Sequence, residues 1–215
     1  MRLPAHPAID RARAAWRFFS LGLSDFDTTA SLVPSSRFLV DAMLEPADLS
    51  RARCVVELGT GTGTLTKQIL SRMGPGAILY GVELDGDLVA ATTRRFDDPR
   101  LRIRHGSATD LHTLIEPDDV GKVDAVISSL GLSLMDEEIR AGIVRAAGEV
   151  LGPSGVFTQY AYLHARWFAY SQTRAAWFRW RARPFLERHY ASVEGQLVAA
   201  NVPPAIAYTC RRPRA

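Results

Sequence analysis

The fold is decided by residues 55–70, which read VVELGTGTGTLTKQIL. An apolar run ends in an acid, Glu57, and three glycines, Gly59, Gly61 and Gly63, then alternate with threonines before residues that have the apolar spacing of a helix. This order predicts a strand, a tight turn and a helix. Because glycine has no Cβ and readily adopts positive φ, such a turn can approach a ligand closely. We expect the turn to hold a flat ligand.

The glycine spacing separates this turn from two phosphate-binding turns. A Walker loop ends in Gly-Lys-Ser or Gly-Lys-Thr, whereas the first lysine after this turn, Lys67, lies within the predicted helix. The dinucleotide fingerprint spaces its glycines G-x-G-x-x-G, whereas here they are evenly spaced and follow an acid. Triphosphate and dinucleotide binding are therefore disfavoured.

The pattern E-x-G-x-G-x-G resembles motif I of the class I S-adenosylmethionine-dependent methyltransferases. In that family the acid reaches the ammonium group of the cofactor, and the glycine turn lies under its ribose and methionine chain. The resemblance assigns these contacts to Glu57 and to Gly59, Thr60, Gly61 and Gly63. The alternative is a glycine-rich turn that merely connects a strand to a helix.

The composition fits one domain. The chain has 215 residues, 47% of them hydrophobic, so it can bury one substantial core and is short for two. We find no long apolar run that would span a membrane and no signal peptide. Cys54 and Cys210 are the only cysteines, and the five histidines lack metal-ligand spacing, so we expect neither a disulfide framework nor a metal site. A reducing cytosol fits these features.

Arginine is the dominant cation, because Lys67 and Lys122 are the only lysines in a chain of net charge +3. Arginine favours bidentate contacts with phosphate, as in nucleic acid or phospholipid headgroups. A genomic base composition that favours arginine over lysine would give the same counts.

Residues 8–23 are predicted to form an amphipathic helix. Trp16 and Phe19 fall on one face, and Arg13 and Arg17 on another. Such a helix either lies in a membrane interface, with its arginines on anionic headgroups, or packs over the cofactor domain. Both roles remain open.

Strands and helices alternate along the rest of the chain, as a doubly wound parallel sheet requires. We predict helices at 37–44, 87–95 and 136–151, strands at 77–82, 101–105 and 123–127, a fifth strand that ends at Tyr162, and a hairpin formed by 193–200 and 205–211. The predicted fold class is therefore α/β, a Rossmann-like class I methyltransferase fold with a parallel sheet, a C-terminal antiparallel hairpin and an N-terminal amphipathic helix.

Polar residues at the strand ends are candidates for holding the nucleoside. Glu83 ends the second strand, where a nucleoside fold places the ligand of the ribose hydroxyls, and Asp85 is the alternative. After the third strand many class I methyltransferases carry Gly-Asp-Ala, whose aspartate accepts from the adenine amino group. Ser107 and Ala108 stand there in this chain, and Asp110 either supplies the missing carboxylate or caps the next helix.

The end of the fourth strand reads SSLGL from Ser128 to Leu132. We include Ser128 among the cofactor-binding residues. Enzymes that methylate adenine usually place Asn or Asp, then Pro-Pro or Leu-Pro, then an aromatic residue there, so that the amide orients the amino group and the ring stacks on the base. Because this chain has none of these, an adenine substrate is disfavoured.

The stretch from Tyr162 to Tyr190 is unusually rich in aromatic residues and arginine. Tryptophan, phenylalanine and arginine interleave between Arg166 and Arg183 without a single helical face. This mixture is typical of a membrane–water boundary. The same residue types stack on single-stranded nucleic acid, or finish a core as a helical cap.

Several motifs together resemble the bacterial phospholipid N-methyltransferases over nearly the full length. They are Phe18-Phe19, Leu32-Val33-Pro34-Ser35-Ser36, the glycine turn, Gly131-Leu132-Ser133-Leu134, Phe157-Thr158-Gln159-Tyr160-Ala161-Tyr162 and Asn201-Val202-Pro203-Pro204-Ala205. The chain departs from that family at Ser133, where the family has proline, and at Ser107, which replaces its aspartate.

This resemblance implies methyl transfer from S-adenosylmethionine to the amino group of phosphatidylethanolamine. Whether the transfer is repeated, to give phosphatidylcholine, is left open by the resemblance. The amine must lose a proton, and a relay near Ser129, Tyr160 or Tyr162 is our hypothesis, with Tyr162 matching the family's tyrosine. The implied protein is a monomer, peripheral on the inner face of the cell membrane, which contacts anionic lipid through Arg13, Trp16, Arg17, Phe19 and the segment from Arg166 to Arg183. Nucleic acid is not an expected partner.

We divide the chain into residues 1–48, a helical lid and membrane-contact segment, and residues 49–215, a methyltransferase domain with a helical aromatic and basic insertion at about 163–189. Two other functions compete with lipid methylation. One is ribosomal RNA adenine N-methylation, which shares the core. The other is a non-catalytic module that binds a membrane or a partner.

Overall fold

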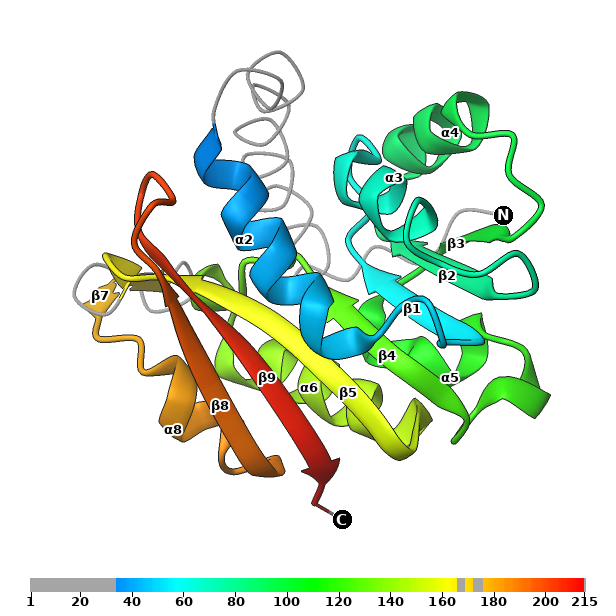
Figure 1. Ribbon diagram of the computed structural model, residues 1–215. Coiled ribbons are helices and arrows are strands. Elements are labelled where there is room, and N and C mark those ends of the chain that lie inside the picture. The colour runs from blue at the N-terminus through cyan, green and yellow to red at the C-terminus, as the bar shows by residue number, and fades with distance from the viewer. Residues whose placement is uncertain (1–33, 166–168, 172–175, 215) are drawn as a thin grey trace.

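The computed structural model of the chain describes residues 34–165, 169–171 and 176–214 (Figure 1). The helix expected at 8–23, with Arg13, Trp16, Arg17 and Phe19, lies outside the described residues, as does part of the segment from Arg166 to Arg183. Among the helices in these ranges, none combines the length and apolar character needed to cross a bilayer.

Seven strands form one sheet in the order β3-β2-β1-β4-β5-β9-β8. Neighbours from β3 to β5 pair in parallel, whereas β9 is antiparallel to both β5 and β8. The strands are β1 (Cys54–Leu58), β2 (Ile78–Glu83), β3 (Leu101–His105), β4 (Val123–Ser128), β5 (Leu151–Tyr162), β8 (Tyr190–Val198) and β9 (Ala205–Pro213). The predicted parallel sheet with a C-terminal antiparallel hairpin is confirmed.

Helices cover both faces of this sheet, with α2 in front and α6 behind in Figure 1. The helices are α2 (Pro34–Leu44), α3 (Thr64–Leu70), α4 (Gly86–Arg95), α5 (Leu111–Leu114), α6 (Glu137–Val150) and α8 (Ala182–Leu186). The short 3-10 turns are η1 (Glu45–Ala47), η2 (Ala108–Asp110), η3 (Pro117–Asp119) and η4 (Leu132–Leu134). The structure describes α2 from Pro34, three residues before the predicted start at Arg37.

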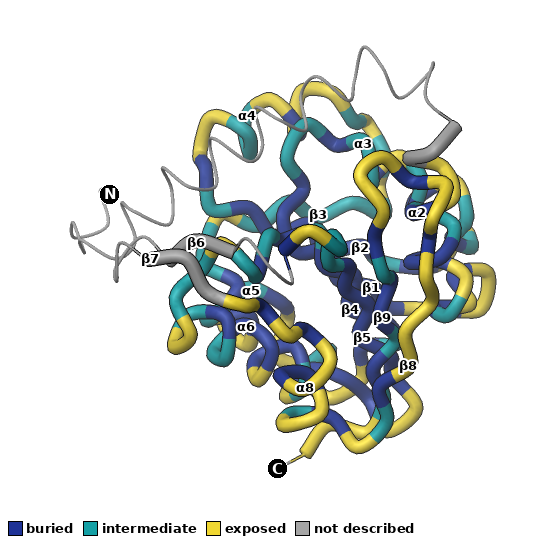
Figure 2. The backbone as a smooth tube through the Cα atoms, turned by 90° about the vertical axis from the view of Figure 1, so that its left-hand side faces the viewer, coloured by how far each residue is buried: buried dark blue, intermediate teal, exposed yellow. Residues whose placement is uncertain are grey.

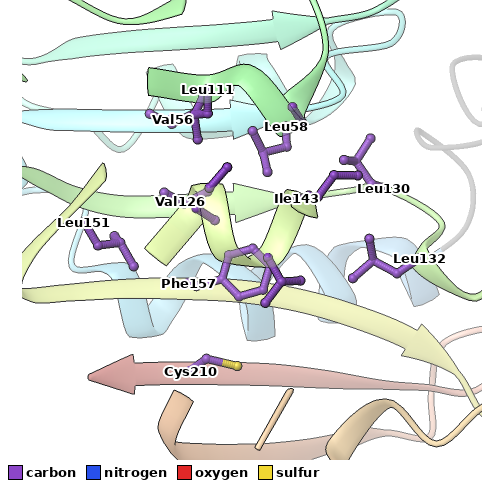
Figure 3. Close-up of a cluster of buried hydrophobic side chains, with 14 of the residues drawn as sticks. Val56, Leu58, Leu111, Val126, Leu130, Leu132, Ile143, Leu151, Phe157 and Cys210 are labelled. Carbon is purple, nitrogen blue, oxygen red and sulfur yellow. The ribbon is translucent and has the colours of Figure 1, made fainter. Parts of the chain in front are cut away.

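Alternate residues of the central strands enter two separate cores. Val56, Val126 and Phe157 pack against α5, α6 and α8, together with residues such as Ile143 and Cys210 (Figure 3). Their strand neighbours pack against α2 and α3 on the other face. Burial on both faces explains why these strands are continuously apolar, and Figure 2 shows the central strands as the most buried part of the chain.

The stretch expected as a helical insertion at 163–189 has a different structure. Its described residues include two short antiparallel strands, β6 (Ala169–Ser171) and β7 (Ala176–Phe178), and the five-residue helix α8. Its apolar residues do not repeat at helical spacing, so a long helix here would have no face to bury. Trp180 and Phe185 are instead 5% and 3% exposed and belong to the core, where the Arg140 guanidinium lies 4.5 Å from the Trp180 ring centroid.

Candidate functional site

The carboxyl ends of β1, β2 and β4 meet at one edge of the sheet, and the glycine turn leaves β1 at this edge. The φ angles of Gly59, Gly61 and Gly63 are 82°, 52° and 88°, in the left-handed region that only glycine adopts without strain. Gly63 is the N-cap residue of α3. The turn therefore has the tight course that the alternating glycines predict.

Glu57 is fully buried at the end of β1. Its Oε2 accepts a hydrogen bond from the Thr66 hydroxyl at 2.7 Å, and its Oε1 has no partner among the described residues. Burial raises the pKa of this carboxyl to about 8, the Thr66 bond lowers it in part, and the charge of Glu83 raises it. The site thus contains a buried carboxyl with one oxygen free to accept from a ligand.

Glu83 binds the glycine turn from the end of β2. Its Oε2 accepts from the Gly61 N–H at 3.0 Å, and its Oε1 accepts from the N–H groups of Leu84 and Asp85 at 2.8 and 3.0 Å. Asp85, the alternative ribose ligand, instead caps α4 by accepting from the Asp87 N–H. Glu83 therefore fixes the glycine turn from the neighbouring strand, at the edge where a ribose ligand is expected.

Two residues of α4 that sequence reasoning missed also hold the turn. The Thr92 hydroxyl donates to the Gly61 carbonyl at 2.9 Å, and Arg95 donates to the Thr62 carbonyl at 2.6 Å. Thr92 is fully buried. No local sequence pattern marks either residue, because their contacts with the turn depend on how α4 packs.

The residues expected at the adenine end lie after β3. Ser107 caps η2 by accepting from the Thr109 N–H, and its hydroxyl also lies 2.7 Å from the Thr109 hydroxyl. Ala108 is buried. Asp110 is exposed and occupies the N-cap position of α5 without a capping hydrogen bond from its side chain. Its carboxylate is thus not engaged as a cap.

Two serines at the end of β4 have different partners. Ser128 is fully buried and its hydroxyl accepts from the Leu130 N–H at 3.4 Å. The Ser129 hydroxyl donates to the Gly59 carbonyl at 2.8 Å, and so joins β4 to the glycine turn. The sequence predicts Ser129 as part of a proton relay, whereas in the structure its hydroxyl bond to Gly59 positions the glycine turn.

The residues of this edge fit the cofactor that the sequence predicts. The unpaired Oε1 of Glu57 suits the ammonium group of an amino-acid chain, because a buried carboxylate oxygen needs a donor. A Cβ built on Gly61 would meet nothing within 4 Å, so open space lies beside the turn. Among the described residues, no cluster of His, Cys, Asp and Glu side chains is suited to a metal ion.

A small hollow of about 20 Å³, room for about one water molecule, lies next to the ends of β4 and β5. It is lined by Gly131, Leu132, Ser133, Gln159, Tyr160, Ala161, Tyr162, Trp180, Ala182 and Leu186. The Tyr160 and Tyr162 rings meet edge to face with centroids 5.3 Å apart. The structure thus brings both predicted catalytic tyrosines to the wall of this hollow.

Both phenols stay protonated at neutral pH. Burial raises the pKa of Tyr160 well above its usual value, and the neighbouring Tyr162 raises it further. Burial also raises the pKa of Tyr162, and the hydrogen bond with Tyr160 lowers this pKa in part. Neither tyrosine is therefore a phenolate base, although each can accept and donate a hydrogen bond.

Comparison with known proteins agrees with this geometry. Residues 55–155 match the family model described as a methyltransferase domain. The chain is 31% identical to the ornithine lipid N-methyltransferase of Singulisphaera acidiphila over 196 residues, which cover 91% of this chain and 92% of that protein. It is 39% identical to the ribosomal RNA small subunit methyltransferase A of Parasynechococcus marenigrum, but over 79 residues that cover 36% of this chain and 26% of the relative.

Solved structures share the fold. The Burkholderia thailandensis 1,6-didemethyltoxoflavin-N1-methyltransferase, solved with S-adenosylhomocysteine, has a TM-score of 0.69 at 16% identity and covers 100% of this chain and 94% of its own. A methyltransferase from Aquifex aeolicus has a TM-score of 0.61 at 13% identity, and the match covers 82% of this chain and 92% of that chain. With the full-length relative and the glycine turn, these findings show that the chain is a class I S-adenosylmethionine-dependent methyltransferase and belongs to the lipid N-methyltransferase family.

Proposed function

We propose that this enzyme methylates the primary amine of a membrane lipid, with phosphatidylethanolamine as the predicted substrate. The observation that carries the proposal is the match to a lipid N-methyltransferase over 91% of this chain. The small hollow at the ends of β4 and β5, which Tyr160 and Tyr162 help to line, is the candidate site for the amine. Because that relative is named for ornithine lipid, ornithine lipid is the second substrate to test. Both lipids carry an amine on a short flexible arm near an acidic group.

The chain's residues bind and orient the reactants. Glu57, the glycine turn and Glu83 would hold S-adenosylmethionine, which supplies an electrophilic methyl group. The amine nitrogen attacks this methyl carbon, the carbon–sulfur bond breaks, and the substrate ammonium must have lost one proton before attack. Leu132, Trp180 and Leu186 are buried in the wall of the hollow and would exclude water from the amine.

Tyr162 would pass the amine proton towards solvent. Its phenol is neutral, so it would accept from the amine while donating onwards, rather than act as a phenolate base. Tyr160 is buried and hydrogen bonds to Tyr162, which would position that phenol. Ser129 is bonded to the Gly59 carbonyl and would contribute by holding the turn.

The β8–β9 hairpin would contact the membrane beside this site. Tyr162 pairs with Ala205, and the Leu163 N–H donates to the Pro204 carbonyl at 2.9 Å, so the hairpin turn extends from the edge that carries the hollow. Leu197 and Val202, at this end of the hairpin, are 59% and 74% exposed. Phe38 in α2 is 50% exposed, and Figure 1 shows the start of α2 at the same end of the molecule.

These apolar side chains support contact with a membrane surface, and we propose that this surface is the inner face of the cell membrane. The predicted helix at 8–23 and the segment from Arg166 to Arg183 would add arginines that bind anionic headgroups. Residues 1–48 would then act as a lid and membrane-contact segment. Deletion of residues 1–22 should abolish sedimentation with anionic vesicles, and unchanged sedimentation would refute this role.

Adenine methylation in ribosomal RNA is the competing function. It is disfavoured because Ser128 and Ser129 direct their hydroxyls to backbone groups, so the end of β4 presents no side-chain amide to a base edge. One experiment decides between the substrates. The full chain is incubated with methyl-labelled S-adenosylmethionine and with vesicles of phosphatidylethanolamine, vesicles of ornithine lipid or total RNA. Label should enter lipid, and label in RNA alone would overturn the proposal.

A further inference from the structure

Gln159 in β5 has an amide whose orientation is fixed by two hydrogen bonds. Its Nε2 donates to the Leu130 carbonyl at 2.9 Å and to the Tyr160 carbonyl at 2.7 Å. Both partners are acceptors, so exchanging the amide nitrogen and oxygen would place oxygen against oxygen. The acceptor atom Oε1 therefore cannot use either carbonyl and must face elsewhere.

This oxygen lacks a partner although it is buried. Gln159 is 2% exposed, and no donor among the described residues reaches Oε1. Leaving a buried carbonyl oxygen unpaired is unfavourable, and such groups in native proteins call for an explanation. Gln159 also lines the small hollow at the ends of β4 and β5 with Gly131, Ser133 and Tyr162. An unpaired acceptor at the wall of a substrate hollow points to a donor that the ligand supplies.

We propose that Gln159 Oε1 accepts an N–H of the substrate amine and orients its nitrogen for methyl transfer. This inference rests on the proposed function and names the residue that recognises the amine. An amide oxygen carries no formal charge, so it can bind the amine after its proton has left. A carboxylate at the same position would favour the ammonium form and so oppose the loss of that proton.

The same contact would distinguish substrate from product. Each methyl group added replaces one N–H, and a trimethylated ammonium has no N–H to donate. A fully methylated lipid would therefore lose the hydrogen bond to Gln159 and bind more weakly than the primary amine. A residue that only supported β5 would not change the relative affinity for the two lipids.

The first test compares wild-type, Q159L and T158V enzymes on vesicles of phosphatidylethanolamine or ornithine lipid. For whichever lipid the wild-type enzyme methylates, Q159L should lower kcat/KM by about 10–100-fold, as expected for a lost hydrogen bond to an ionisable group. Its affinity for S-adenosylhomocysteine should match wild type. Thr158 also has an unpaired buried hydroxyl but does not line the hollow, so T158V should behave as wild type.

The second test measures binding. Dihexanoyl phosphatidylethanolamine and dihexanoyl phosphatidylcholine are titrated into the full chain saturated with S-adenosylhomocysteine. Q159L should weaken binding of the first lipid about 10–100-fold and leave the second unchanged. If Q159L does not fold, Q159N, which withdraws the amide by one methylene, is measured in the same way and should weaken the first lipid selectively.

The outcomes separate this inference from the proposed function. If the folded Gln159 variants have the same kinetics and lipid affinities as the wild type, the assignment of Gln159 is overturned and the proposed function is unaffected. Equal weakening of both lipids would also overturn it, because that pattern indicates a structural role. If the wild-type enzyme methylates neither lipid, the proposed function fails and the assignment fails with it.

Discussion

The Thr66 hydroxyl donates to Glu57 Oε2 at 2.7 Å and so leaves Oε1 as the one unpaired oxygen of a fully buried carboxyl. The bond joins the end of β1 to α3 across the glycine turn. It also settles which carboxyl oxygen a ligand can reach. Since burial raises the pKa of Glu57 to about 8, the free protein holds this group protonated at pH 7.

Cofactor binding should therefore release a proton at Glu57. The ammonium group of the ligand favours the ionised form of Glu57. The affinity for S-adenosylhomocysteine should therefore rise about tenfold with each unit of pH up to pH 8 and stay constant at higher pH. Calorimetry in two buffers of different ionisation enthalpy should give a release approaching one proton per site at pH 7. E57Q should abolish the release and weaken binding about 10–100-fold.

T66V provides the control for this linkage. The Thr66 bond lowers the pKa of Glu57, so its loss should raise that pKa and move the pH dependence of binding to higher pH. A wild-type protein that releases no proton between pH 6 and 8 would show that Glu57 is already ionised. In that case the ammonium contact would need another explanation.

The same group sets a pH dependence of stability in the free protein. The pKa of Glu57 is about 8 when folded and 4.5 in its unperturbed state, so the folded chain binds more protons between these values. Its contribution to the free energy of unfolding should then fall as pH rises from about 4.5 to 8, and stay constant above. Denaturant titrations of wild type and E57Q across this range should diverge in that direction. Parallel curves would contradict it.

The sequence predicted the parts of the site that are contiguous or lie at strand ends. Glu57 and the glycine turn lie close together in the sequence. The place of Glu83 at the site could be predicted because β1 and β2 pair in parallel, which brings the carboxyl ends of both strands to one edge of the sheet. The partners of these groups were not predictable. Thr66 and Thr92 reach the turn only through the packing of α3 and α4, which no local pattern encodes.

The stretch at 163–189 shows the other limit of sequence reasoning. Its aromatic residues and arginines predicted a surface helix, yet Trp180 and Phe185 are buried against Arg140. The composition of this stretch did not determine which of its rings face the core. Gln159 is similar, because its fixed amide depends on Leu130, 29 residues earlier in the chain.

G61A should lose cofactor affinity with little further loss of stability. Alanine at a φ of 52° costs about 1–2 kcal/mol, and its Cβ would enter the open space beside the turn. Gly121, with a φ of 75° and open space around it, lies at the amino end of β4, far from the site. G61A and G121A should therefore lower Tm by similar amounts, whereas only G61A should weaken S-adenosylhomocysteine binding. Equal affinities would show that the cofactor avoids Gly61.

Y162F should slow methyl transfer without changing cofactor binding. Loss of a positioned proton acceptor and donor should reduce kcat about 10²-fold or more. The expected control is Y208F, on β9, which keeps an aromatic ring near the hairpin and leaves the β5 phenols intact; its kcat should stay near wild type. Full turnover in Y162F, with normal S-adenosylhomocysteine binding, would remove Tyr162 from the relay.

The hairpin turn should bind the bilayer through its exposed apolar side chains. The Asn201 amide donates to the Pro203 carbonyl at 2.6 Å and shapes the turn that presents Val202. The double variant L197D/V202D should reduce sedimentation with anionic vesicles severalfold, because it replaces apolar contacts by two charges that anionic headgroups repel. S154D, which adds a charge near the opposite end of β5, should sediment as wild type. Equal sedimentation of all three proteins would place the membrane contact elsewhere on the chain.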